Sequence, residues 1–74
     1  MATGTVKWFS EERGLGFITP DGGGEDLFVH QSEILGENDR RLHNGERVKF
    51  DTEKDLKGPN AVRVQRILEP ASVG

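Results

Sequence analysis

Two short segments, GLGFI at residues 14–18 and DLFVH at residues 26–30, decide the fold, because in each a phenylalanine stands next to an aliphatic residue in a strand-like segment. Successive side chains of a β-strand point to opposite faces. In the second segment Leu27 and Val29 therefore share one face, and Phe28 lies on the other. If the aliphatic side chains fill the core, the aromatic rings are left on the outer surface.

Further strands are indicated on both sides of these segments, where runs rich in Val, Ile, Phe, Trp and Thr are separated by glycine, proline and asparagine. Five short strands in so small a chain predict an all-β fold that closes into a barrel, which leaves no exposed sheet edge. The predicted strands are residues 4–10, 15–20, 26–30, 46–53 and 61–67. The longest connection, residues 31–45, is expected to form one helical turn and then a mobile loop.

The 74 residues are enough for one domain, which we place at residues 1–67, with residues 68–74 as a short tail. The absence of cysteine excludes disulfides and thiolate metal sites, and fits a reducing compartment. No apolar run has the length of a signal peptide or a membrane span. A cytoplasmic protein is therefore expected.

Charge and residue types narrow the function. A net charge of −3 argues against tight binding to duplex DNA, which depends on Lys and Arg. The glycines do not form a phosphate-binding loop, and no Ser, His and Asp arrangement is supported by spacing. With only His30 and His43 as histidines, a metal site is not expected. We therefore expect neither an enzyme nor a cofactor.

The outward aromatic side chains suggest a binding surface, since nucleic-acid bases stack on Trp, Phe and His at about 1–3 kcal/mol per base. The competing interpretation, that a given ring belongs to the core, is the better one for a lone phenylalanine. It is as good as the binding interpretation for Phe9, which must point away from Trp8 in a regular strand. The surface is predicted to hold Trp8, Phe17, Phe28 and His30, with positive charge from Lys7, Arg13, Arg40, Arg41 and Arg63.

Over about residues 3–67 the chain resembles bacterial cold-shock proteins and the cold-shock domains of Y-box proteins. The matching motifs are GTVKWF (4–9), GLGFI (14–18) and DLFVH (26–30), with Gly45, VKF (48–50) and KGP (57–59) at the later places. The resemblance implies a five-stranded antiparallel oligonucleotide-binding (OB-fold) barrel of the Greek-key type. It also implies binding of single-stranded RNA or DNA, with a pyrimidine preference, and a role as an RNA chaperone or a regulator of transcription or translation.

Three positions depart from the family pattern, in which a Phe or Tyr is usual: Leu15, Gln31 and Asp39. If each missing ring removes about 1 kcal/mol, binding weakens roughly a hundredfold. Gln31 can still hydrogen-bond a base, and Arg40 can take over stacking beside Asp39. The candidate nucleic-acid-binding residues, by resemblance and by position, are Lys7, Trp8, Phe9, Arg13, Leu15, Phe17, Asp26, Phe28, His30, Gln31, Arg40 and Arg63.

The predicted function is thus a monomeric single-strand binder that takes up pyrimidine-rich RNA or DNA and needs neither a membrane nor a small-molecule substrate. The rival hypothesis is a barrel whose aromatic patch binds a partner protein, as exposed apolar patches commonly do. The negative net charge and the departures at Leu15 and Asp39 favour that rival.

Overall fold

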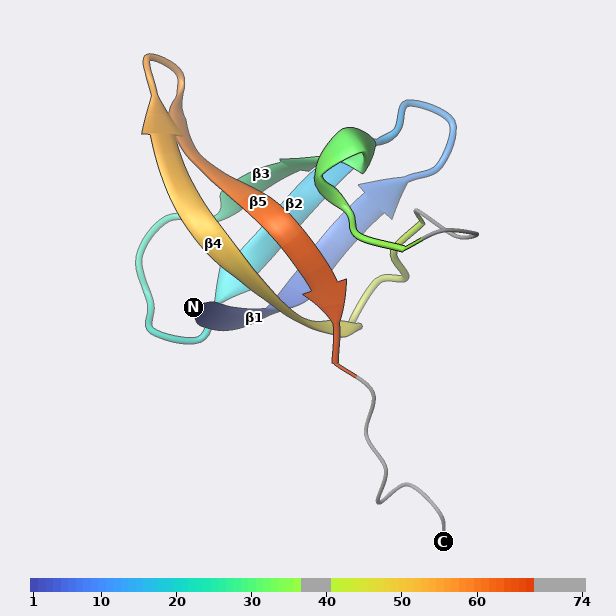
Figure 1. Cartoon of the computed structure of the whole chain (residues 1–74), viewed down its shortest axis with the longest axis horizontal. Helices are drawn as coiled ribbons and strands as arrows, with labels where there is room; N and C mark the ends of the chain where they lie inside the picture. The colour runs from blue at the N-terminus through green and yellow to red at the C-terminus, as the bar shows by residue number, and fades with distance from the viewer. Residues whose placement is uncertain (37–40, 68–74) are drawn as a thin grey trace, which may run out of the picture.

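A computed structural model describes residues 1–36 and 41–67 of the chain. Five strands and one short 3₁₀ turn make up the described fold, and the strands wrap around a common interior (Figure 1). The strands are β1 Ala2–Ser10, β2 Leu15–Pro20, β3 Leu27–His30, β4 Arg47–Asp55 and β5 Gly58–Arg66, and the turn η1 is Gln31–Glu33.

The strands close into a barrel in the order β1-β2-β3-β5-β4, which confirms the predicted closure. One part of the expectation was wrong, because the barrel is not antiparallel throughout. β3 and β5 run parallel and pair at Phe28 and Asn60, while the other neighbours are antiparallel. The reason is parity: five strands around a closed ring cannot alternate in direction at every contact.

The core lies inside this ring and holds the predicted aliphatic faces of the strands. Two further core residues were not predicted, because Ile34 and Leu42 belong to the connection 31–45, which was expected to form one helical turn and then a mobile loop. Each is 2% exposed, and Ile34 bridges to Val64 of β5. Residues 37–40 of that connection lie outside the described residues. The buried apolar side chains are Val6, Ile18, Leu27, Val29, Ile34, Leu42, Val48, Phe50, Ala61, Val62 and Val64.

A bulge in β1 controls which side chains face outward. The strand pairs Val6 with Ile18 and then Trp8 with Phe17, so Lys7 is an extra residue. In a regular strand Trp8 would share the inward face of Val6. The bulge instead leaves both Lys7 and Trp8 exposed and lets the next residue pack against the core.

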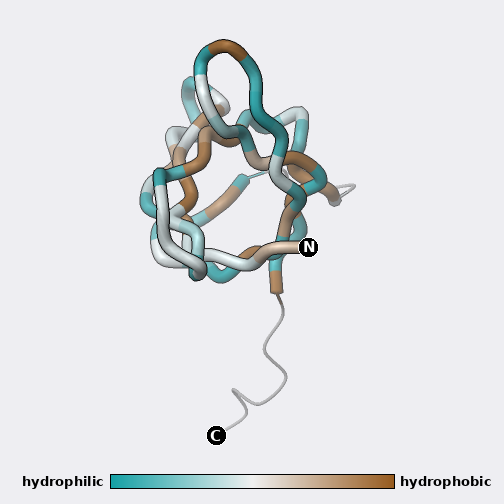
Figure 2. The backbone as a smooth tube through the Cα atoms, turned by 90° about the vertical axis from the view of Figure 1, so that its left-hand side faces the viewer, coloured by the Kyte–Doolittle hydropathy of each residue, from teal (hydrophilic) through white to brown (hydrophobic). Residues whose placement is uncertain are grey.

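The last hairpin is longer than predicted, because Gly58 and Pro59 were interpreted as a break. The carboxylate of Asp55 accepts the backbone N–H groups of Lys57 (2.8 Å) and Gly58 (3.2 Å) and closes a tight turn. Pro59 then pairs with Lys54 inside the ladder. This hairpin stands off the barrel, and Figure 2 shows an apolar tip between hydrophilic flanks.

A second bulge lies in β5. Its partner β4 pairs Lys49 with Gln65 and Asp51 with Val62, which leaves one extra residue on β5. Arg63, within this irregularity, has a φ of 51°, the left-handed region that costs an ordinary side chain about 1 kcal/mol. Its guanidinium is held by Asp51 at 2.6 Å.

The described part of the chain contains no helix that is long and apolar enough to cross a membrane.

Candidate nucleic-acid interface

Strand register places three aromatic rings in one row across the barrel. Trp8 of β1 pairs with Phe17 of β2, and Phe17 pairs with Phe28 of β3. The ring centroids of Trp8 and Phe17 are 5.5 Å apart, and those of Phe17 and Phe28 are 5.8 Å apart in an edge arrangement. Both distances fall within the range of favourable aromatic pairs. The row continues to Asn60 of β5.

These rings lie outside the core, on the face that the alternation predicted. Trp8 is 38% exposed, and Phe17 and Phe28 are half-buried. The neighbouring residue on each strand is turned inward, as Ile18 and Val29 show with 0% exposure. The rings therefore support one another at their edges and leave part of each ring open to solvent.

His30 extends this surface by one more position along β3. It is exposed and pairs with Leu15 of β2, which is half-buried. The backbone N–H of Ser32 donates to Nδ1 of His30 at 3.1 Å, and the Ser32 hydroxyl lies 2.9 Å from the same atom. Because Nδ1 accepts a hydrogen bond, the neutral ring carries its proton on Nε2. We name Trp8, Phe17, Phe28 and His30 the aromatic surface.

The glycines beside the rings make room for the protein itself. A Cβ on Gly16 would lie 2.3 Å from the carbonyl oxygen of Trp8, so β1 and β2 need a glycine there to approach each other. A Cβ on Gly14, whose φ is 70°, would lie 2.7 Å from the side chain of Gln31. Both glycines are therefore required by contacts within the protein. The side chain of Gln31 packs over the β1–β2 turn. The backbone N–H of Gln31 donates to the Gly14 carbonyl at 2.8 Å.

Phe9 is on the inner side, where the bulge in β1 turns it. The ring is half-buried and packs against the core, and its backbone N–H donates to Asn44 at 3.0 Å. Sequence analysis left core and surface placements equally good for Phe9, and the structure shows that the ring packs against the core. Phe9 supports the strand that carries Trp8, and its own contact with nucleic acid stays a prediction.

One ion pair borders the rings. The Lys7 ammonium donates to Asp26 at 3.0 Å, and the Thr19 hydroxyl donates to the other oxygen of that carboxylate at 3.2 Å. The hydrogen bond from Lys7 is the main cause that holds the pKa of Asp26 below its usual value. Asp26 is therefore ionised at neutral pH and accepts hydrogen bonds only.

The arginines proposed to bind phosphates differ in their placement. Arg13 is exposed in the β1–β2 turn, where its backbone N–H donates to Ser10. Arg63 is turned toward Asp51, and the hydrogen bond between them lowers the pKa of that carboxyl. Arg41 reaches Glu11 at 3.2 Å. Arg40, like Asp39, lies outside the described residues.

Two hollows flank Phe28 and form the concave part of the site. The larger, the main groove, has a volume of about 520 Å³ and also contacts Phe17 and Asn60. The smaller, about 250 Å³, runs from Phe28 past His30. Both reach Asp55, and the carboxylates of Glu25 and Asp26 also line the main groove. The site is thus aromatic on its floor and acidic along one side.

Sequence reasoning missed Asn60 as a site residue. Its strand is last in the chain, and the contact with Phe28 arises only where β5 meets β3 at the closure of the barrel. The only signal in the sequence is that Asn60 directly follows the KGP motif of residues 57–59.

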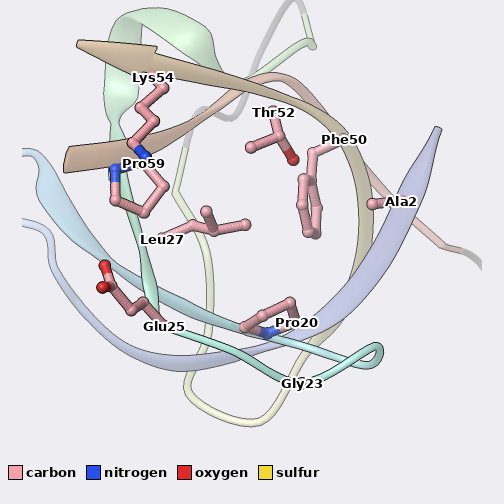
Figure 3. A pocket seen from close by; sticks show the side chains of 9 residues that line it. All are labelled: Ala2, Pro20, Gly23, Glu25, Leu27, Phe50, Thr52, Lys54 and Pro59. Atoms are coloured by element: carbon pink, nitrogen blue, oxygen red, sulfur yellow. The ribbon is translucent and has the colours of Figure 1, made fainter.

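A third hollow lies at one end of the barrel, away from the row of rings. Figure 3 shows Phe50 and Leu27 pointing into a space that strands β1 and β4 curve around. Its volume is about 330 Å³, and Pro20, Pro59 and Ala2 complete most of its apolar wall. Phe50 and Leu27 are core residues, so this hollow is the open end of the interior.

Comparison with known proteins identifies relatives of this chain. The model of the "'Cold-shock' DNA-binding domain" matches residues 2–67. "Glycine-rich protein 2" of Nicotiana sylvestris is 53% identical over an alignment 73 positions long, which covers 86% of this chain and 34% of that protein. "Cold shock-like protein CspA" of Stigmatella aurantiaca is 51% identical, covering 90% of this chain and 98% of the relative.

A solved structure agrees in three dimensions. The "drosophila Unr CSD456" structure superposes with a TM-score of 0.74 at 27% identity, covering 99% of this chain and 29% of the other. The expected OB-fold barrel is confirmed by this likeness together with the closed five-strand ring. With a family model covering nearly all of the described residues, the chain belongs to the family of the cold-shock DNA-binding domain.

Proposed function

We propose that this protein binds single-stranded RNA or DNA by stacking bases on the aromatic surface. The observation that carries the proposal is the row Trp8, Phe17, Phe28, in which register alone brings three rings to one outer face. Such rings accept the flat face of any base, and each stacked base contributes about 1–3 kcal/mol. Family membership supports the same class of ligand.

The proposed mode of action is passive. A strand whose bases lie on the rings cannot pair with a second strand, so binding opposes RNA secondary structure, as an RNA chaperone does. Regulation of transcription or translation would follow from the same binding. The chain needs no catalysis and no cofactor for this, and we propose that it acts as a monomer. The cytoplasmic location stays a prediction.

Positive charge supports the proposal only in part. Lys7 and Arg13 lie at the β1 side of the rings, where they suit phosphates. The main groove is nonetheless lined by the acidic residues Glu25, Asp26 and Asp55. We therefore propose modest affinity that comes mainly from stacking, with a preference for pyrimidine-rich strands retained from the family resemblance.

The test uses the fluorescence of Trp8, the only tryptophan. The protein is titrated with a pyrimidine-rich hexanucleotide, and with a duplex of the same sequence as the control. We expect quenching at micromolar concentrations of the single strand and little with the duplex. Unchanged fluorescence at high micromolar single strand, confirmed by calorimetry, would reject nucleic-acid binding and favour the protein-partner hypothesis.

A further inference from the structure

Asn60 stands beside the ring on which a base would stack. It pairs with Phe28 across the parallel contact of β3 and β5, and it lines both hollows that flank that ring. A base lying on Phe28 would bring one edge toward this side chain. Asn60 is therefore placed to contact base edges, whereas the rings contact base faces.

Asp55 fixes the direction in which the Asn60 amide points. Oδ2 of Asp55 accepts Nδ2 of Asn60 at 2.8 Å, while Oδ1 accepts the two backbone N–H groups of the hairpin turn. The hydrogen bond from Asn60 is the main cause of a lowered pKa at Asp55. An ionised carboxylate can only accept, so the amide nitrogen must face it and the carbonyl oxygen must face away.

The Oδ1 atom of Asn60 has no partner among the described residues. No buried side-chain oxygen or nitrogen in the described part of the chain lacks a hydrogen bond, so this atom is open to solvent. It joins the carboxylates of Glu25, Asp26 and Asp55, which line the same groove. Three acidic residues and one basic residue, the exposed Lys57, thus line the described part of this groove.

An acceptor-rich edge discriminates between bases. Cytosine presents an amino group at position 4, a donor, where thymine and uracil present a carbonyl oxygen. A carbonyl against Asn60 Oδ1 would leave two acceptors facing each other and would lose water from both without replacement. An amino group would satisfy the acceptor.

We propose that Asn60, oriented by Asp55, is a specificity-determining residue that favours amino-bearing bases over uracil and thymine at the position stacked on Phe28. This inference rests on the proposed function and narrows the pyrimidine preference to cytosine.

The test compares two RNA probes, hexacytidine and hexauridine, whose bases differ only at ring positions 3 and 4. Dissociation constants are measured by calorimetry for the unaltered protein and for Asn60→Leu, which has a similar size and no acceptor. We expect the unaltered protein to bind hexacytidine about threefold to tenfold more tightly, the effect of one net hydrogen bond. In Asn60→Leu the two affinities should become equal within about twofold.

Gln65→Leu is the matched control, because it makes the same amide-to-leucine change at an exposed position of β5 outside both hollows. It should keep the preference for hexacytidine. Asp55→Ala, which frees the amide to rotate, should reduce that preference while thermal unfolding shows that the barrel is intact.

The outcomes separate the two proposals. Equal binding of both probes by the unaltered protein, or an undiminished preference in Asn60→Leu, overturns the role of Asn60 and leaves single-strand binding intact. Binding of neither probe overturns the proposed function and this inference with it.

Discussion

At the residue scale, the aromatic surface depends on a few side chains that contact one another. Phe17 lies between Trp8 and Phe28 and touches both rings. None of the three is fully buried, so each contributes less to the core than an inward residue such as Phe50, which is 1% exposed. Substitutions here should separate binding from stability.

Phe28→Ala is expected to weaken binding of a pyrimidine-rich strand by about 1–3 kcal/mol, because it removes one stacking platform. Its free energy of unfolding should fall by only about 1 kcal/mol, or roughly 4–8 °C in Tm. Calorimetric titration and thermal unfolding measure the two effects. Leu35→Ala, at an exposed residue away from the rings, is the control that should bind normally. A large loss of stability with unchanged affinity would mean that Phe28 is a core residue.

Asp21 should make the free energy of unfolding of the barrel depend on pH in the acid range. The bidentate hydrogen bond from Arg47, with both contacts at 2.7 Å, is the main cause that lowers the pKa of Asp21 from 3.8 to about 2. Because the folded pKa lies below the unfolded one, this stabilisation is complete above pH 3.8 and disappears as pH falls through about 2.

The variant Asp21→Asn isolates that contribution. Its Tm should lie below that of the unaltered protein at pH 6, and the gap should close as the pH approaches 2. Thermal unfolding followed by circular dichroism across this range measures it. A gap that stays constant with pH would show that the ion pair with Arg47 does not control acid stability.

At the element scale, the bulge in β1 decides what the strand presents. Before it, Val6 faces the core, and after it Phe9 packs inward, while Lys7 and Trp8 both face solvent. One extra residue therefore adds a cation beside the tryptophan without moving any apolar residue out of the core.

Deletion of Lys7 should restore regular pairing without inverting the strand. Val6 would still pair with Ile18 and Trp8 with Phe17, so the barrel should fold with a loss of about 1–2 kcal/mol. Strand binding should weaken, because the cation is lost. Chemical denaturation and the Trp8 titration measure these effects.

Deletion of Thr5 is the contrasting change. It would move Thr3 into the site of Gly4, where a Cβ lies 2.6 Å from the Thr19 carbonyl oxygen. This second deletion should unfold the protein at moderate temperature. Equal tolerance of both deletions would show that Lys7 is not the extra residue of a bulge.

At the scale of the whole molecule, the charge distribution limits how nucleic acid can bind. The net charge is −3, and the groove beside Phe28 is acidic. Lys7 also stays close to Asp26. Counterion release, which dominates most protein–nucleic acid affinities, should therefore contribute little here.

Binding should accordingly show a shallow salt dependence. With about two phosphates neutralised, affinity for a single strand should fall only about sevenfold between about 50 and about 200 mM salt. Titrations of Trp8 fluorescence at several salt concentrations give the slope. A loss of a hundredfold or more would mean that phosphate contacts, and not stacking, carry the affinity.

Much of the fold could be predicted because alternation is a local property. Leu27 and Val29 are buried, and Phe28 lies outside, as their order along one strand required. The bounds of β2 also agree with the prediction. The errors in β4 and β5 arose at the turn between them, because the carboxylate of Asp55 closes that turn tightly on Lys57 and Gly58 and both strands extend up to it.

By itself the sequence determined the strand-forming segments, the inward aliphatic faces and the kind of side chain available for stacking. The tertiary structure decided the phase shift at Lys7, the inward turn of Phe9, the burial of Ile34 and Leu42, and the meeting of Phe28 with Asn60. The physical reason is the distance along the chain between the residues that interact. Alternation follows from neighbouring residues along the chain, whereas a bulge, a covered core and a parallel contact depend on residues that come together only when the barrel closes.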